Sequence, residues 1–461
     1  MTIKRIDREP VGPELLMSLR GDPISRNQTL KRFVATLDEI EGAFSIFLNS
    51  PWGDGKTFFV KQLCLILQLS NDQLRENMPF CAQEYWEENS EAFPVNDLYL
   101  PVYFNAWRND DYNDPLLPLL GCIASSCEYA EVGKRRNAKE AIAAAVDSAA
   151  ALVGLNLNTS NLVEGFSGES FLDGYEKREA FRSQFDEAVS SALREIASTT
   201  VIFVDDLDRC RPDFAVKLLE QTKALFAREN VIMVFSTDML QLGQAIRGLY
   251  GVSTDPNKYL ERFYDMKIDL PPVDAVRYLK YMGFGADSQH LYTNVANGFI
   301  SAIGSSMRDM NRLLSSLKAG QIYVNQPEGI YGSWNKAVSY AKCAMLPAFI
   351  VIAQARPDIW SQVLRGSDFE RVYDYCKINV AFIRVIDECI RCNNSNRDGS
   401  ERPAINDLQR REIVVHFCSL VFIDDEFDSR YRKALEALDS SFRMGFDKSV
   451  FRTLAADYRK D

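Results

Sequence analysis

Apolar residues gather in short runs along this chain, and the first run is followed by a loop that contains glycine. Residues 44–48 form a short, mostly apolar run that is typical of a buried strand. A longer apolar segment covers residues 58–69 and is long enough for a helix in a domain core. The polar residues between them include Gly53 and Gly55, and glycine lets a backbone turn tightly. The pattern therefore predicts a strand, a loop and a buried helix, in that order.

Three further apolar runs predict more strands in the first part of the chain. They cover residues 98–107, 199–204 and 230–235, and polar residues follow each of them. Helical patterns lie between these runs, at residues 115–129, 175–197 and 213–227. Strands that alternate with helices are typical of a parallel sheet with helices on its faces. We therefore expect an α/β fold in this part of the chain.

The pattern changes at Pro271 and Pro272, where strand patterns end and amphipathic helices follow. We expect a core over residues 1–270 with a helical insertion at about 124–198, a lid-like helical region over 271–325, and an all-helical C-terminal domain over 326–461. Inside the insertion, residues 139–155 are rich in alanine but are divided by Asp147. This segment is shorter than the ~20 apolar residues that a membrane span needs, so we expect no span there.

The loop at residues 50–58, called the phosphate loop below, follows the pattern G-x-x-x-x-G-K-[ST] except that Ser50 replaces the first glycine. Serine is tolerated there if its backbone keeps a negative φ. Backbone N–H groups of such a loop and the N-terminus of the next helix bind phosphate. We expect Lys56 to contact the terminal phosphates and Thr57 to ligate Mg²⁺. The residues expected around the nucleotide are Ser50, Pro51, Trp52, Gly53, Asp54, Gly55, Lys56, Thr57 and Phe58.

Acidic residues follow the strand predicted at 199–204. Ligands of open parallel sheets lie beyond the carboxyl ends of the strands, so we expect Asp205 to face the phosphate loop and hold Mg²⁺ through water. Asp206 is expected to polarise the attacking water. Candidates for sensing the γ-phosphate follow the next predicted strand, and they are Ser236, Thr237 and Asp238.

The charge balance argues against nucleic acid as a direct ligand of the whole chain. Lysine and arginine total 53 and aspartate and glutamate 64, which gives a net charge of −11, and no basic stripe is interleaved with aromatic residues. The 10 cysteines lie mostly in apolar segments, and the N-terminus is polar and charged. These features favour a reducing cytoplasm.

Several segments together resemble the KAP family of P-loop NTPases, which is related to AAA+ and STAND proteins. The phosphate loop resembles the family's W-G-x-G-K-[ST], residues 104–107 its F-N-x-W, and residues 205–209 its D-D-L-D-R. Residues 259–263 and 308–312 resemble its later Y-L-E-[KR]-[IF] and R-x-x-[KN]-R segments. Many members carry membrane helices between the two nucleotide motifs, where this chain has only residues 139–155.

The resemblance implies a regulatory switch that binds and hydrolyses ATP with Mg²⁺, in which Lys56 and Asp206 are catalytic. Known members occur in bacterial anti-phage defence gene sets and in animal membrane-signalling scaffolds. Other protein subunits, among them products of neighbouring defence genes, and further copies of the chain are the partners implied. The alternative is a nucleotide-binding scaffold that hardly hydrolyses and assembles partners through its C-terminal helices, and Ser50 slightly favours it.

An arginine from a helical region or a neighbouring subunit often completes the γ-phosphate site of P-loop switches. Arg262 follows the last core segment, whereas Arg308 and Arg312 are four residues apart and share one face of a predicted helix. The family resemblance favours Arg308 as the sensor, and we expect it to be the third catalytic residue.

Overall fold

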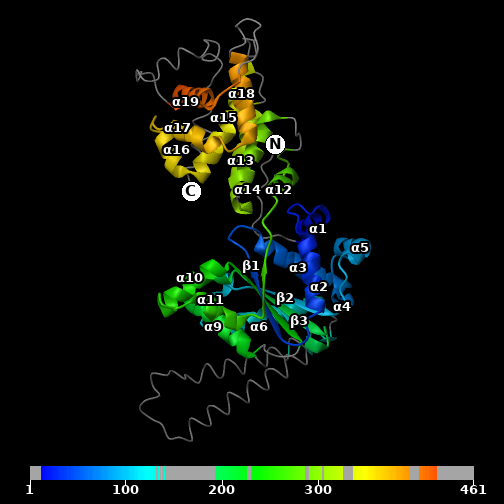
Figure 1. Cartoon of the computed structure of the whole chain (residues 1–461). Coiled ribbons are helices and arrows are strands. Elements are labelled where there is room, and N and C mark those ends of the chain that lie inside the picture. The colour runs from blue at the N-terminus through cyan, green and yellow to red at the C-terminus, as the bar shows by residue number, and fades with distance from the viewer. Residues whose placement is uncertain are drawn as a thin grey trace. The chain divides into compact units, whose positions relative to one another are not determined.

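A computed structural model describes residues 12–130, 133–134, 136–137, 140, 193–225, 230–285, 290–303, 306–324, 336–393 and 404–422. The chain divides into two compact units, the first formed by Asp7–Pro272 and the second mainly by Val273–Asp461. Figure 1 shows the elements of each unit. The segment at 139–155 and most of the helix predicted at 175–197 lie outside the described residues. Among the helices that the structure describes, none combines the length and apolarity that a bilayer crossing requires.

A sheet of five parallel strands forms the centre of the first unit, in the order β2-β3-β4-β1-β5. The carboxyl ends of β1, β3 and β4 meet, because Ser236 lies opposite both Leu48 and Asp205. The predicted parallel sheet flanked by helices is confirmed. β5 was not predicted, since four residues that are alternately half-buried and exposed are too few to show a period. The strands are β1 Phe44–Asn49, β2 Tyr99–Asn105, β3 Thr199–Asp205, β4 Val231–Thr237 and β5 Met266–Asp269.

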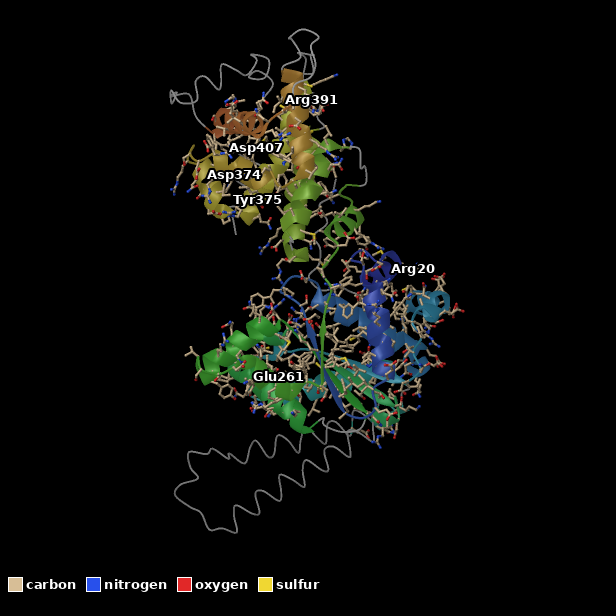
Figure 2. All side chains as sticks on the ribbon, in the orientation of Figure 1. Arg20, Glu261, Asp374, Tyr375, Arg391 and Asp407 are labelled. Carbon is tan, nitrogen blue, oxygen red and sulfur yellow. The ribbon has the colours of Figure 1, made fainter. Side chains whose placement is uncertain are left out.

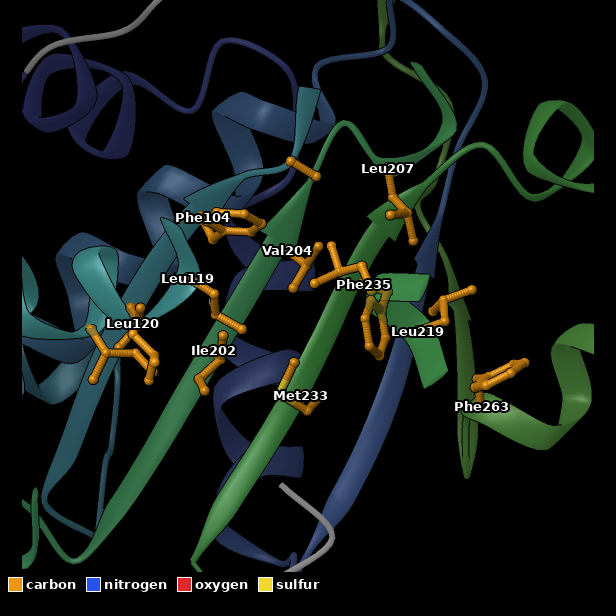
Figure 3. Packing of buried hydrophobic residues seen from close by; sticks show 14 of the residues in the cluster. Phe104, Leu119, Leu120, Ile202, Val204, Leu207, Leu219, Met233, Phe235 and Phe263 are labelled. Carbon is orange, nitrogen blue, oxygen red and sulfur yellow. The ribbon is translucent and has the colours of Figure 1, made fainter. Parts of the chain in front are cut away.

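Helices cover both faces of the sheet, which explains why its strands are apolar throughout. In β3, Ile202 and Val204 belong to one core cluster, while Val201 and Phe203 belong to the other. Figure 3 shows the first cluster, in which strand residues lie beside side chains of α6 such as Leu119. This face is covered by α6 Leu116–Ser126, α9 Pro212–Leu225, α10 Met239–Tyr250 and α11 Pro256–Leu260. The other is covered by α1 Gly12–Gly21, α2 Asn27–Asp38, α3 Lys56–Ser70 and α5 Phe80–Asn89.

The connection between α3 and β2, for which no element was predicted, is largely helical. It contains α4 Asp72–Arg75, α5 and the short 3₁₀ helix η1 Ser90–Ala92. Tyr85, Trp86 and Phe93 are buried against α3 and the sheet. Burial of these aromatic side chains holds the segment against the core. The many polar residues of the segment gave no indication of this packing.

The second unit consists of helices in its described part, as predicted. Helices of both predicted regions, 271–325 and 326–461, pack together here, with α15 contacting α13, α14 and α18. Arg411 of α19 pairs with Asp374 of α17 at 3.1 Å, and Figure 2 shows the position of Asp374. The helices are α12 Ala275–Tyr281, α13 Leu291–Ile303, α14 Met307–Val324, α15 Lys336–Ala355, α16 Pro357–Val363, α17 Glu370–Cys376, α18 Val380–Asn393 and α19 Asp407–Phe422.

Candidate functional site

The phosphate loop joins β1 to α3 at the carboxyl edge of the sheet. The Ser50 N–H donates to the Thr237 carbonyl of β4 at 3.3 Å, so the loop begins alongside that strand. Gly53 and Gly55 have φ values of 91° and 81°, a region in which a Cβ atom is strained. Ser50 is not among the described residues with positive φ, so the condition under which serine can replace glycine is met.

The side chain of Lys56 is buried inside this loop. Its Nζ donates to the carbonyl oxygens of Ser50 at 2.5 Å and Pro51 at 3.3 Å. Burial lowers the pKa of the Lys56 ammonium. Four nearby carboxylates act against this shift without reversing it, namely those of Asp208, Asp238, Asp205 and Asp206. An ammonium group that neutral carbonyls hold in such a loop is well placed for a phosphate, which offers charged acceptors.

The start of α3 adds a second group of donors. Gly55 occupies the position before the helix and provides no side-chain cap, and the first turn contains no acidic residue. The first N–H groups of a helix lack partners within the helix, and the helix dipole favours an anion at this end. The half-buried Thr57 lies on the same turn. This arrangement suits a phosphate.

Asp205 ends β3 and is completely buried. Its Oδ2 accepts a hydrogen bond from the Tyr103 hydroxyl at 3.1 Å, whereas its Oδ1 has no partner. The hydroxyls of Ser50 and Ser236 are also buried without partners. Ser236 is opposite Asp205 in the sheet, and Ser50 is two residues after Leu48, which is also opposite Ser236. Three unpaired polar groups therefore gather at the edge where the phosphate loop lies.

Asp206 follows β3 with a φ of 59°, a conformation that few residues other than glycine adopt. Its carboxylate accepts from Asn105 Nδ2 at 3.1 Å and pairs with Arg209 Nε, also at 3.1 Å. Burial and then the Asp205 charge raise the pKa of Asp206 to about 6, although Arg209 and Asn105 act against this rise. Both carboxylate oxygens already have partners, so a water bound to Asp206 must use a second lone pair of one oxygen.

Asp208, to which the sequence had assigned no role, connects the phosphate loop to β4. It lies in the 3₁₀ helix η5 Leu207–Arg209. Its carboxylate accepts hydrogen bonds from Trp52 Nε1 of the loop and, at 3.2 Å, from the Thr237 hydroxyl of β4. The third acidic position of the Asp-Asp-Leu-Asp-Arg segment was the available signal for this residue.

The three residues proposed as γ-phosphate sensors have different environments. Ser236 has the unpaired hydroxyl described above, and Thr237 donates to Asp208. Asp238 caps α10, because its carboxylate accepts from the N–H groups of Leu240 at 3.1 Å and Gln241 at 3.3 Å. Of the three, Ser236 therefore has the side chain that lacks a protein partner.

The arginine candidates lie away from the phosphate loop in sequence and differ in their surroundings. Arg262 belongs to the 3₁₀ helix η6 Glu261–Phe263, and its guanidinium lies 4.3 Å from the centre of the Tyr259 ring. It precedes β5, so it lies at the amino edge of the sheet, opposite the phosphate loop of its own chain. Arg308 and Arg312 lie on α14 of the second unit.

Comparison with known families agrees with this geometry. A model of the KAP family P-loop domain matches residues 26–283, more than half of the 461 residues. None of the curated proteins compared with the chain matches it. The match includes β1, the phosphate loop, the Asp205–Asp206 strand end and β5. The resemblance inferred from the sequence is thus confirmed, and the chain belongs to the KAP family of P-loop NTPases.

Proposed function

We propose that the chain binds ATP together with Mg²⁺ at the phosphate loop and hydrolyses it slowly. The observation that carries this proposal is the group of buried, unpaired atoms at the carboxyl edge: Ser50 Oγ, Asp205 Oδ1 and Ser236 Oγ. Buried polar atoms in native proteins are rarely left without partners. These atoms, next to a buried Lys56, fit a ligand that brings both donors and acceptors.

The roles proposed within the first unit follow from the positions of its groups, whereas the role of Arg308 follows from the family resemblance. Lys56 and the first N–H groups of α3 neutralise and orient the terminal phosphates. Thr57, through its hydroxyl, and Asp205, through its free Oδ1 and a water, would hold Mg²⁺. When bound, Mg²⁺ neutralises charge that develops on the β- and γ-phosphates. Asp206 orients the attacking water, and Arg308 contacts the γ-phosphate.

The test of nucleotide binding is a calorimetric titration with ATP and excess Mg²⁺. Lys56→Ala removes the charge at the terminal phosphates and is expected to weaken binding about tenfold to a hundredfold. Lys258→Ala removes an exposed lysine of α11 and is expected to leave the affinity unchanged. Equal affinities in the wild type and Lys56→Ala would remove the basis of the assignment. A parallel titration with GTP determines which base is preferred.

A nucleotide-binding scaffold with little hydrolysis is the second candidate. It is favoured by the two partners of Asp206, since Asn105 and Arg209 occupy both carboxylate oxygens. Phosphate release by the wild type and by Asp206→Asn separates the candidates. Turnover that Asp206→Asn loses, while ATP binding persists, supports the ATPase. No turnover in either protein, with ATP still bound, supports the scaffold.

We propose that the bound state of the nucleotide acts as a regulatory signal, with the second unit as the contact for other protein subunits. An anti-phage role in bacteria follows from the family resemblance, and deletion of the gene in a host under phage infection tests it. A cytoplasmic location is supported by the 10 cysteines of the sequence, which lie mostly in apolar segments and form no disulfide in the part of the chain that the structure describes. Recovery of the protein only from a salt-resistant membrane fraction would contradict that location.

A further inference from the structure

Arg26 is a buried cation at the start of α2, and the site described above does not use it. Its side chain is 1% exposed. The Asp22 carboxylate accepts hydrogen bonds from the backbone N–H groups of Arg26 at 2.8 Å and Asn27 at 3.1 Å. The Arg26 carbonyl accepts from the Leu30 N–H at 2.9 Å in the first turn of α2. The backbone of Arg26 is therefore anchored before its side chain makes any contact.

The guanidinium of Arg26 joins two backbone segments that are far apart in the sequence. NH1 donates to the Asp54 carbonyl at 2.6 Å, and NH2 donates to the Pro271 carbonyl at 2.7 Å. Asp54 lies in the phosphate loop, and Pro271 is the second-last residue of the first unit. A guanidinium is a rigid fork of donors, so it holds both carbonyls in one geometry. We call this arrangement the Arg26 bridge.

Burial of this charge is costly, which indicates that the bridge has a purpose beyond filling space. Burial lowers the pKa of Arg26 to about 10, although the nearby Asp54 carboxylate acts against this shift. The side chain still carries its charge at neutral pH, and its Nε is buried without a partner. An apolar side chain of similar volume avoids the desolvation cost of a buried cation. What such a side chain lacks is the ability to bind two carbonyl oxygens.

The bridge also determines how the phosphate loop presents one of its donors. The carbonyl of Asp54 and the N–H of Gly55 belong to the same peptide group, and the described residues contain no cis peptide bond. In a trans peptide these two groups point in opposite directions. Because Arg26 holds the carbonyl, the Gly55 N–H points away from Arg26. Backbone N–H groups at this position of the loop are those that bind phosphate.

We propose that Arg26 is a positioning residue that couples phosphate binding in the loop to residues 271–274, the linker between the two units. These residues have no regular secondary structure and lead from β5 to α12. A phosphate that binds the Gly55 N–H restrains the peptide group between Asp54 and Gly55. The Arg26 guanidinium transmits this restraint to the Pro271 carbonyl, so the backbone of the linker loses conformational freedom. The proposal rests on the nucleotide site proposed above.

Hydrogen exchange in the full chain tests the coupling, with amides of residues 53–57 reporting on the loop and amides of residues 273–274 on the linker. The probes are ADP and a non-hydrolysable ATP analogue, each with Mg²⁺. In the wild type, both probes are expected to slow exchange in the loop and in the linker. In Arg26→Met, nucleotide affinity is expected to fall about tenfold. At saturating nucleotide this variant is expected to keep protection in the loop and lose it in the linker.

Two further variants make the outcome specific. Arg26→Lys keeps the charge but not the fork, so it is expected to lose linker protection as Arg26→Met does. Arg75→Met removes a guanidinium whose NH1 donates to the Leu69 carbonyl at 2.7 Å. Leu69 lies near the end of α3 that is opposite the loop, so this variant is expected to behave like the wild type. Slow exchange of amides 201–204 in β3 verifies that each variant is folded.

The results also separate this proposal from the nucleotide site itself. A wild type that binds neither probe contradicts the proposed function. In that case, hydrogen exchange of the linker is measured without nucleotide to test the Arg26 bridge. Faster linker exchange in Arg26→Met than in Arg75→Met supports the bridge, and equal exchange overturns it. If the wild type binds nucleotide, linker protection that is equal in all variants, or absent in the wild type, overturns the coupling.

Discussion

At the scale of single residues, Asp206 combines two features that are unfavourable for folding. Its left-handed backbone is strained, and its pKa is raised to about 6 by burial and by the Asp205 charge. The pKa of this carboxyl group is higher in the folded state than its ordinary value of 3.8. The free energy of unfolding of the protein therefore decreases as the pH rises from about 3.8 through about 6. Such costs are typical of functional sites.

The raised pKa leads to a prediction for the pH dependence of hydrolysis. A protonated Asp206 cannot polarise water, so we expect kcat/KM for ATP to fall as the pH decreases through about 6. The measurement is a rate profile over about pH 5 to 8 in excess Mg²⁺. A profile that stays flat through pH 6 contradicts the assigned role of Asp206.

A second prediction at this scale uses two glycines with the same backbone conformation. Gly55 in the phosphate loop has φ 81°, and Gly42 before β1 has φ 82° with open space around it. Alanine at either position is expected to lower the free energy of unfolding by about 1–2 kcal/mol, since both backbones are left-handed. Nucleotide affinity is expected to fall only in Gly55→Ala. Urea unfolding and ATP titration measure the two effects, and an equal loss of affinity in Gly42→Ala contradicts a local role for the loop.

At the scale of elements, the site depends on how the loop is held against the ends of β3 and β4. Asp208 is central to this arrangement because it accepts hydrogen bonds from the phosphate loop through Trp52 and from β4 through Thr237. Asp205, three residues earlier, provides the unpaired Oδ1 of the proposed magnesium site. A shift of Trp52 therefore changes the loop and the strand ends together.

We predict that Trp52→Phe weakens ATP binding about fivefold and lowers the free energy of unfolding by about 1 kcal/mol, because one hydrogen bond to a carboxylate is lost and the ring remains. Trp107→Phe is the control, since Trp107 is also exposed and its ring lies 5.5 Å from the Arg209 guanidinium, yet it lies outside the phosphate loop. Calorimetry and urea unfolding give both quantities. If the two variants lose affinity equally, the hydrogen bond to Asp208 does not position the loop.

At the scale of the whole molecule, two units share one chain, and the proposed catalytic residues are divided between them. Lys56 and Asp206 lie in the first unit, whereas Arg308 lies on α14 of the second. If Arg308 contacts the γ-phosphate, α14 responds to the triphosphate and not to the diphosphate. Binding and turnover then depend on different parts of the chain.

Arg308→Ala is accordingly expected to leave ADP affinity nearly unchanged while it lowers hydrolysis and removes the ATP-driven change in the second unit. Arg312→Ala, the other arginine candidate on the same helix, shows whether the effect is specific to Arg308. Phosphate release and hydrogen exchange of α13 and α15, each with ADP and with ATP, measure these effects. Equal losses of ADP and ATP binding would indicate a structural role for Arg308, and no loss would remove it from the site.

Much of the fold could be predicted from local pattern. The strands at 44–48, 199–204 and 230–235 were visible because residues buried on both faces of a sheet must all be apolar. The phosphate loop was visible because a tight turn with two left-handed residues needs glycines at Gly53 and Gly55. Asp205 and Asp206 could be proposed as site residues because they come directly at the carboxyl end of a predicted strand. Each of these features is encoded within a few neighbouring residues.

What the sequence by itself determined, then, is the α/β architecture, the loop and the acidic strand end. The tertiary structure alone decided that Asp208 ties the loop to Thr237, and that Arg26 joins carbonyls 28 and 245 residues away. It also decided which carboxylate oxygen stays unpaired at Asp205. The physical reason is that every residue offers a backbone carbonyl, so no sequence pattern marks the one that a distant guanidinium binds.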